Sequence, residues 1–224
     1  ERSRGLGDVY KRQKIYGAEA LMRYHSSQFG DVSPTEFIPI LEETNMIIPA
    51  GRWILDRAAA ACRDFQTLIP DFKISINLSY VQVLKSYVGS DVIRTVQKYG
   101  ISPDSLTIEL TESGLLETDS HLKKMWTYLK KEGISLALDD FGTGYSNFAY
   151  LATLRPDTIK IDREFTCRAL HNSYEYQLLA LCSSMAHYLR LSICIEGVET
   201  AEELSAVRKL SPDYIQGYFF GRPC

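Results

Sequence analysis

The stretch FKISINLS, Phe72–Ser79, decides the fold because apolar and polar side chains alternate along it. Its isoleucines would point to one face of a β-strand, and its serines and Asn77 would point to the other. The same alternation recurs in Leu106–Ser113, Thr158–Asp162 and Leu191–Gly197. Each of these strands therefore has one apolar face and one face that carries polar or charged side chains.

Strand-like segments alternate with helix-like segments along the rest of the chain. The expected strands are Ile15–Tyr24, Phe72–Ser79, Leu106–Ser113, Ile134–Asp140, Thr158–Asp162, Leu191–Gly197 and Tyr214–Phe220. The expected helices are Pro34–Thr44, Ala50–Thr67, Tyr87–Tyr99, Ser120–Glu132, Asn147–Thr153, Ser173–Leu189 and Ala201–Lys209. Such alternation predicts parallel strands with helices outside them. A doubly wound open sheet gives the same pattern, but seven strands that need only one more before residue 15 favour a (β/α)8 barrel of the TIM type.

Local signals support the ends of several helices. Ser33-Pro34-Thr35-Glu36 is a capping box with proline at the first helical position. Gly100 and Gly133 stand where a helix would stop. These signals fix helix boundaries on both sides of the alternating stretch.

The polar faces of the strands carry the chemistry. In a barrel the apolar faces pack on the helices, so the polar faces must point into the lumen. Buried charges without partners cost several kcal/mol each, so we expect them near the carboxyl-terminal mouth, where barrel enzymes hold their sites. The residues concerned are Glu19, Asn77, Glu109, Asp139, Asp140, Lys160, Glu196 and Gln216.

This set contains five carboxylates and an amide that are hard oxygen donors, which suit Mg²⁺ or Mn²⁺ better than zinc. The adjacent Asp139 and Asp140 could bridge two ions, and two ions would activate a water against a phosphate ester. Each residue also has a plainer interpretation, since a strand-end carboxylate often caps a helix and Lys160 could extend into solvent. The pattern as a whole predicts metal-assisted hydrolysis.

Composition excludes several classes of protein. The chain has 224 residues, 45% apolar and 24% charged, with a net charge of −3, so it lacks the basic excess of a protein that binds polymeric nucleic acid. Its five cysteines are scattered, which suits a reducing compartment. It contains no signal peptide and no apolar run of membrane-spanning length. We expect a cytoplasmic domain, although other parts of the parent protein could anchor it to a membrane.

Short motifs along the chain resemble the EAL domain family of cyclic di-GMP phosphodiesterases. The resemblance covers residues 15–224 and is carried by these motifs in the family's order: Glu19-Ala20-Leu21-Met22-Arg23, Phe37-Ile38-Pro39, Asn77-Leu78-Ser79, Glu109-Leu110-Thr111-Glu112-Ser113, Asp139-Asp140-Phe141-Gly142-Thr143-Gly144-Tyr145-Ser146, Lys160-Ile161-Asp162, Glu196-Gly197-Val198-Glu199-Thr200 and Gln216-Gly217-Tyr218. One three-letter motif means little, whereas the ordered set is specific.

The resemblance implies a reaction and its metals. The family opens one phosphodiester bond of cyclic di-GMP to give linear pGpG, requires two Mg²⁺ or Mn²⁺ ions, and is inhibited by Ca²⁺. Glu19, Asn77, Glu109 and Asp139 match the ligands of one ion. Asp139 and Asp140 match those of the second, with Glu196 near both.

The resemblance also assigns residues that bind no metal. Lys160 matches the residue that orients or deprotonates the attacking water, and Glu112 the glutamate that holds the Asp139–Ser146 loop. Arg23 and Leu21 match substrate contacts. Glu199 and Gln216 match positions that bind substrate or order water.

The chain departs from the family at its two ends. We expect residues 1–14 to be a non-native or unstructured leader, so that 15–224 is an EAL domain truncated at both ends. It would then lack the family's first, antiparallel strand and its final helix.

The expected partners also follow from the resemblance. We expect a homodimer through Asn147–Leu154 and Tyr174–Leu189, and a sensory or GGDEF-type domain in the full-length protein. The alternative function is that of a non-catalytic cyclic di-GMP receptor. Degenerate relatives of that kind lose metal ligands, and this chain keeps every matched acidic residue.

Overall fold

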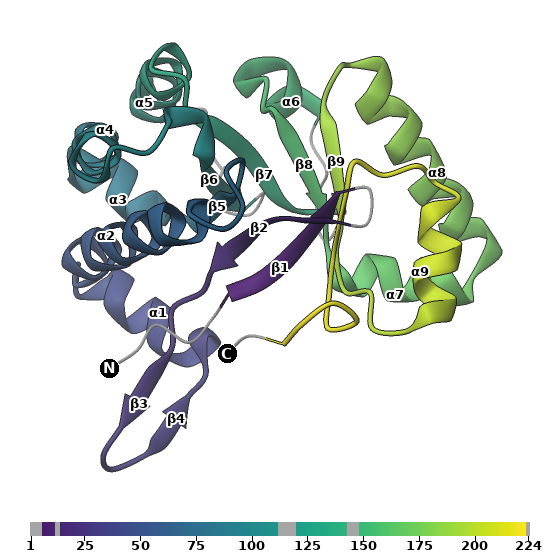
Figure 1. The fold of residues 1–224 in the computed structure, drawn as a ribbon, viewed down its shortest axis with the longest axis horizontal. Helices are drawn as coiled ribbons and strands as arrows, with labels where there is room; N and C mark the ends of the chain where they lie inside the picture. The colour runs from purple at the N-terminus through teal and green to yellow at the C-terminus, as the bar shows by residue number, and fades with distance from the viewer. Residues whose placement is uncertain (1–5, 12–13, 112–119, 143–147, 223–224) are drawn as a thin grey trace.

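The barrel is the central element of the computed structural model, which describes residues 6–11, 14–111, 120–142 and 148–222 (Figure 1). Its eight strands close in the order β1-β10-β9-β8-β7-β6-β5-β2. They are β1 Leu6–Lys11, β2 Lys14–Ala20, β5 Lys73–Asn77, β6 Leu106–Thr111, β7 Ser135–Phe141, β8 Thr158–Ile161, β9 Ser192–Ile195 and β10 Tyr214–Gln216. The expected TIM-like barrel is therefore confirmed, and the open-sheet alternative is excluded.

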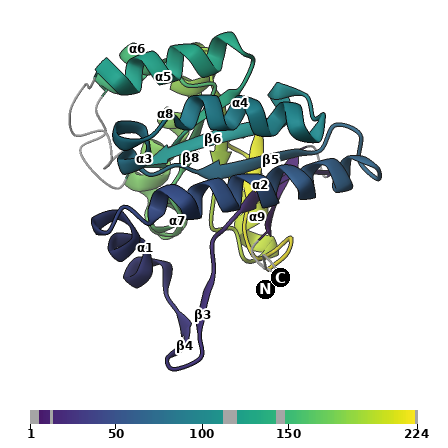
Figure 2. The same cartoon turned by 90° about the vertical axis from the view of Figure 1, so that its left-hand side faces the viewer.

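Helices cover the outside of this barrel (Figures 1 and 2). They are α1 Pro34–Glu43, α2 Ile47–Gln66, α3 Tyr80–Lys85, α4 Val88–Tyr99, the 3₁₀ turn Pro103–Ser105, α5 Ser120–Lys131, α6 Phe148–Leu154, α7 Arg163–His171, α8 Ser173–Tyr188 and α9 Ala201–Arg208. None of the helices in the described ranges is both long enough and apolar enough to cross a membrane. A short hairpin, β3 Tyr24–Ser26 with β4 Gly30–Val32, projects beside α1 (Figure 2).

The first strand corrects one expectation. The view that residues 1–14 are an unstructured leader is wrong for Leu6–Lys11, which form β1. This strand runs antiparallel to both neighbours, with Val9 opposite Gly17 of β2 and opposite Gln216 of β10. The antiparallel strand that we expected to be missing therefore closes the barrel. Backbone hydrogen bonds on both edges hold such a strand, so it needs no apolar pattern in its sequence.

Other boundaries shift by a few residues. Strand β2 ends at Ala20 rather than Tyr24, because the chain turns there into the β3–β4 hairpin. Strand β10 ends at Gln216 rather than Phe220. Two helices, α3 and α7, were not expected. Ser79 caps α3 and Asp162 caps α7 through side chains that accept backbone hydrogen bonds, a signal that the sequence carried.

The alternation in the strands has the expected outcome. The outward isoleucines of β5, β6, β8 and β9, such as Ile108 and Ile159, are fully buried against the helices. Parallel pairing places Asn77 of β5 level with Glu109 of β6, and Thr111 of β6 level with Asp139 of β7. Polar residues of neighbouring strands therefore lie side by side inside the barrel.

The helix ends also follow the sequence. The hydroxyl of Ser33 accepts the backbone N–H of Thr35, and Pro34 occupies the first turn of α1. Gly100 ends α4 in the left-handed conformation, with φ at 65°. A residue without a Cβ adopts this conformation at little cost.

Candidate active site

A buried lysine lies at the centre of the site. Lys160 of β8 is 4% exposed, and its Nζ lies 2.8 Å from Glu109 Oε2 and 2.8 Å from Glu196 Oε1. The same Nζ lies 3.2 Å from Asp139 Oδ1 and 3.5 Å from Glu19 Oε2. Strands β2, β6 and β7 and the end of β9 supply these four carboxylates, which we call the acidic cluster. The barrel thus brings together residues far apart in the sequence, and Lys160 does not extend into solvent.

Two amides hold Glu19 in place. Asn77 Nδ2 donates to Glu19 Oε1 at 2.6 Å, and Gln216 Nε2 donates to Glu19 Oε2 at 2.8 Å. Both carboxylate oxygens therefore have a fixed direction, which a binding site requires of its ligands.

The backbone at Asp140 brings a fifth carboxylate to the site. Asp140 has φ at 55°, a left-handed conformation that is uncommon outside glycine and asparagine. The register between β7 and β8 shifts at this point, between Leu138 and Phe141. Such a bulge re-aims a side chain, so consecutive aspartates can serve one site. Burial, followed by the charges of Asp139 and Asp162, raises the pKa of Asp140 to about 6.

The electrostatics of the cluster show too many negative charges for one cation. Burial raises the pKa of Glu196 to about 8 and also raises the pKa of Glu109 and Asp139, against the pull of Lys160. Burial acts likewise on Glu19, but the charge of Lys160 and the bonds from Gln216 and Asn77 lower its pKa overall. The four carboxylates raise the pKa of Lys160 well above its ordinary value, although burial opposes them. The lysine therefore stays charged, and three carboxylate charges remain unbalanced when all four are ionised.

The donor set fits a hard divalent cation. Single carboxylate oxygens of Glu19, Glu109 and Asp139 lie within 4.8 Å of one another, and all three residues are buried. Within the described part of the chain, Asp139 Oδ1 and Glu196 Oε1 are buried without a hydrogen-bond donor in good geometry, although each lies within ion-pair distance of Lys160. Buried acceptors of this kind call for a cation, and an all-oxygen set favours Mg²⁺ or Mn²⁺. The residues present therefore could hold a metal ion.

A cavity of about 820 Å³ lies beside the cluster at the carboxyl-terminal mouth of the barrel. Apolar side chains of α1 and α2 line it, together with Leu21, Arg23 and Asn77. Glu42 also lines it and accepts a hydrogen bond of 2.6 Å from Ser79 Oγ. Its size and largely apolar walls are typical of small-molecule sites.

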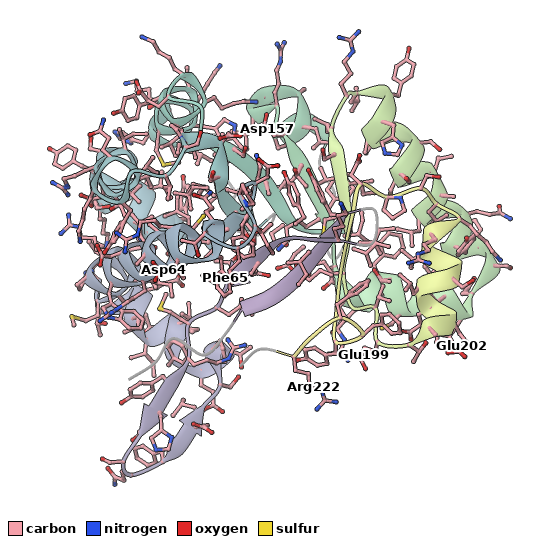
Figure 3. The ribbon with its side chains drawn as sticks, in the orientation of Figure 1. Asp64, Phe65, Asp157, Glu199, Glu202 and Arg222 are labelled. Carbon is pink, nitrogen blue, oxygen red and sulfur yellow. The ribbon has the colours of Figure 1, made fainter. Side chains whose placement is uncertain are left out.

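The remaining predicted residues lie away from the cluster or outside the described residues. Glu199 follows β9, at the end of the barrel opposite Asp157, and pairs with Arg163 at 2.6 Å (Figure 3). Glu112 falls outside the described residues, as does part of the Asp139–Ser146 loop. The structure therefore joins Glu19, Asn77, Glu109, Asp139, Lys160, Glu196 and Gln216 in one network, places Asp140 beside it, and places Arg23 and Leu21 in the cavity next to it.

Sequence reasoning missed two residues near the site. Asp162 is close enough to raise the pKa of Asp140, and Arg163 pairs with Glu199 and lies over the ring of Tyr218. Asp162 belongs to a quoted motif, and its position two residues after Lys160 was the available signal. Nothing in the local sequence pointed to Arg163, because its partners are distant along the chain.

The fold and the site agree with comparisons to known proteins. The protein-family model of the EAL domain matches residues 9–223, and the chain belongs to the EAL domain family. It is 37% identical over 213 residues to the oxygen sensor protein DosP of Escherichia coli, covering 94% of this chain and 26% of DosP. It is 30% identical to the cyclic di-GMP phosphodiesterase PdeF of Escherichia coli, covering 97% of this chain and 28% of PdeF. The chain thus spans little more than a quarter of these relatives.

Solved structures resemble the barrel closely. The PaMucR phosphodiesterase in complex with c-di-GMP superimposes with a TM-score of 0.87 at 30% identity, covering 98% of this chain and 90% of that one. The cAMP-bound EAL enzyme Bd1971 gives a TM-score of 0.90 at 29% identity, covering 98% of this chain and 62% of that one.

We expect Asp139→Asn to separate stability from metal binding. Removing one of several repelling buried charges should leave the melting temperature of the metal-free protein unchanged or higher. The same change should weaken Mg²⁺ binding at least about tenfold, because it replaces a charged donor. Melting temperatures measured over a Mg²⁺ titration would check both effects.

Asp213→Asn is the matched control. Asp213 accepts the backbone N–H of Ile193 at 3.0 Å and lies 3.1 Å from His187, away from the cluster. This variant should melt at a lower temperature and keep the Mg²⁺ response of the parent. An unaltered Mg²⁺ response in Asp139→Asn would show that Asp139 is not a ligand.

Proposed function

We propose that this chain is a metal-dependent cyclic di-GMP phosphodiesterase that opens one phosphodiester bond to give linear pGpG. The buried acidic cluster around Lys160, within an EAL domain, is the observation that carries the proposal. A receptor that only binds the nucleotide would have no need to bury four carboxylates at a cost in folding stability. The names of relatives such as PdeF support the substrate.

Two groups of ligands would hold the metal ions. Glu19, Asn77, Glu109 and Asp139 would hold one, with Asn77 binding through Oδ1 because its Nδ2 donates to Glu19. Asp139 and Asp140 would hold the second, with Glu196 near both. When bound, the ions would supply an activated water and would stabilise the charge that develops on the phosphate.

Lys160 is proposed to direct the attacking water. Its pKa is raised well above the ordinary value, so it acts as a charged hydrogen-bond donor in this geometry. A donor fixed by Glu109 and Glu196 can hold a water in one orientation toward a phosphate at the mouth.

Other residues would bind and orient the substrate. Arg23 would contact a substrate phosphate and Leu21 a base or sugar, since both line the cavity of about 820 Å³. Gln216 keeps Glu19 in its ligand position through the bond of 2.8 Å. Glu199 would order water at the mouth from its place beside Arg163. For Glu112, the proposed support of the Asp139–Ser146 loop rests on the family resemblance.

Metal removal tests the reaction. With Mg²⁺ or Mn²⁺ the protein should convert cyclic di-GMP to pGpG, and Ca²⁺ should suppress the conversion because it does not impose the octahedral geometry of the smaller ion. Chromatography of the nucleotides, with and without EDTA, would measure it. Turnover that persists in EDTA would contradict metal dependence, and binding without turnover in Mg²⁺ would favour the receptor function.

Replacement of Lys160 tests its role. Lys160→Ala should still bind Mg²⁺, because it removes no ligand, and should lower kcat at least about a hundredfold. Lys160→Arg should also lower kcat, because a planar guanidinium does not reproduce the compact ammonium group of lysine. Steady-state kinetics at saturating Mg²⁺ would measure both variants, with KM changing much less than kcat.

Lys130→Ala is the control for this test. Lys130 pairs at 3.0 Å with the partly exposed Asp157, and exposed pairs of this kind contribute about 0–1 kcal/mol. It should retain the turnover of the parent. Turnover in Lys160→Ala within a few-fold of the parent would mean that the lysine only balances charge.

We also propose that the domain works within a longer protein, beside a sensory or GGDEF-type domain. The relatives are several times longer than their matched part, and MucR of Pseudomonas aeruginosa is named as a bifunctional diguanylate cyclase and phosphodiesterase. The sequence of the native gene on both sides of this domain would test this proposal. A gene that encodes no further domain would contradict it.

We propose that the chain forms a homodimer through α6 and α8, because α8 has an exposed apolar face. Tyr174, Leu178 and Leu181 lie at helical spacing on this face, with exposed fractions of 68%, 40% and 67%. Leu181→Asp should therefore dissociate the dimer, whereas Leu68→Asp, at a leucine after α2 that is even more exposed, should not. Sedimentation velocity would measure both. A monomeric parent protein at high concentration would refute the dimer.

A further inference from the structure

The amino-terminal half of the barrel lumen contains a second cavity. It measures about 240 Å³ and lies below the acidic cluster, which it reaches at Glu109 and Lys160. Its other end is lined by Lys73, Ser135 and Ser192, the first residues of their strands. Asp157, just before β8, also lines it, whereas Glu199 at the carboxyl-terminal end does not (Figure 3). The cavity therefore approaches the cluster from the end of the barrel opposite the candidate active site.

Most of the residues that line this cavity are small or polar. Barrel interiors are usually filled by layers of branched apolar side chains. Here the small lining residues are Gly17, Ser75, Thr107, Ser135, Ala137, Thr158, Ser192 and Cys194, and the larger Lys73 and the stacked rings of Tyr16 and Tyr214 also line the cavity. The small residues leave part of the lumen unfilled, and the hydroxyl groups among them can bind water. With about 30 Å³ of liquid volume for each water, the cavity has room for several.

Partial exposure of these hydroxyl residues shows that they face open space in the lumen. Thr107, Ser135 and Thr158 are partly exposed, although their outward-facing neighbours Ile108 and Ile159 are completely buried. Their exposed surface therefore faces the inside of the barrel rather than the layer of helices.

Gln216 supplies an independent sign of bound water. Its Nε2 donates to Glu19, while its Oε1 is buried and has no hydrogen-bond partner among the residues that the structure describes. If the amide nitrogen and oxygen of Gln216 were exchanged, the oxygen would face the carboxylate of Glu19 and the two would repel each other. The nitrogen is therefore the atom that faces Glu19. A buried acceptor without a donor is costly, and Gln216 lines the cavity. A water in the cavity is the group that can donate to it.

We propose that the amino-terminal half of the lumen is a water-binding channel through which solvent reaches Lys160 and Glu109 from the end of the barrel opposite the active site. Water would then exchange with the acidic cluster while a substrate covers the carboxyl-terminal mouth. This consequence rests on the proposed phosphodiesterase function, whereas the channel itself does not.

Two buried cysteines allow a direct test. Cys194 lines the cavity, whereas Cys62 is packed between α2 and β5 and donates to Phe72 O. Methyl methanethiosulfonate, a small neutral thiol reagent, should modify Cys194 at least about tenfold faster than Cys62 in the folded protein, because Cys62 must await an opening of the structure. Burial raises the pKa of both thiols, so neither cysteine is activated by a lowered pKa. Peptide mass spectrometry would follow both rates.

Variants that block the channel with a larger side chain provide the decisive test. Ser135→Leu and Ser192→Leu should each remove the advantage of Cys194, whereas Ser205→Leu on the exposed face of α9 should not. Thermal melts of all three variants would establish that they fold. Equal rates at Cys194 and Cys62 in the parent protein, or a persistent advantage in both folded plug variants, would overturn the proposal.

Addition of cyclic di-GMP, with Ca²⁺ to suppress its hydrolysis, tests from which end of the barrel the thiol reagent enters. Since the reagent enters from the opposite end, the nucleotide should not protect Cys194, and protection would overturn entry through the amino-terminal end. Failure of the proposed function would appear as absent turnover with Mg²⁺. The comparison of plugged and parent proteins needs no nucleotide, so the two failures are distinguishable.

Discussion

The burial of four carboxylates around one lysine is the constraint on which the rest of this structure depends. Lys160 pairs with Glu19, Glu109, Asp139 and Glu196 inside the barrel, and its single charge does not balance theirs. Such an arrangement costs folding stability, because charges lose their hydration and repel one another. The apolar layer between strands and helices, with residues such as Ile159 and Ile193 fully buried, offsets that cost. Proteins commonly accept this kind of local instability at a functional site.

Local geometry determines how the charges are presented. Glu19 is held on both oxygens by amides of β5 and β10, so it cannot turn away from the cluster. The left-handed backbone at Asp140 breaks the alternation of β7 and directs a second aspartate to the site. The small residues below the cluster leave space in the lumen, which a layer of branched side chains would have removed. The site is thus built from the backbone and the lumen as well as from its charged groups.

Much of this site could be predicted from the sequence because strand periodicity has a simple geometric meaning. Alternation in Phe72–Ser79 and in the other strands separated an apolar face from a polar face, and parallel pairing then placed Asn77 beside Glu109 and Thr111 beside Asp139. The ordered motifs identified the family, which the comparison with known proteins confirmed. Arg23 and Leu21 were placed in a cavity beside the cluster, but their contacts with a substrate remain proposals.

The sequence by itself determined the fold class, the family and the identity of the charged residues, since each depends on periodicity or on residues close along the chain. Tertiary structure alone decided the place of β1, the pairing of Lys160 with four carboxylates, and the cavity beneath them. Strand β1 is held by backbone hydrogen bonds to β2 and β10, which leave no pattern in side-chain type. The ion pairs join residues that lie far apart in the chain, such as Glu19 and Lys160, and only the closed barrel brings them together. These contacts depend on distances in space rather than along the chain, so no local signal could have predicted the individual pairings or the cavity.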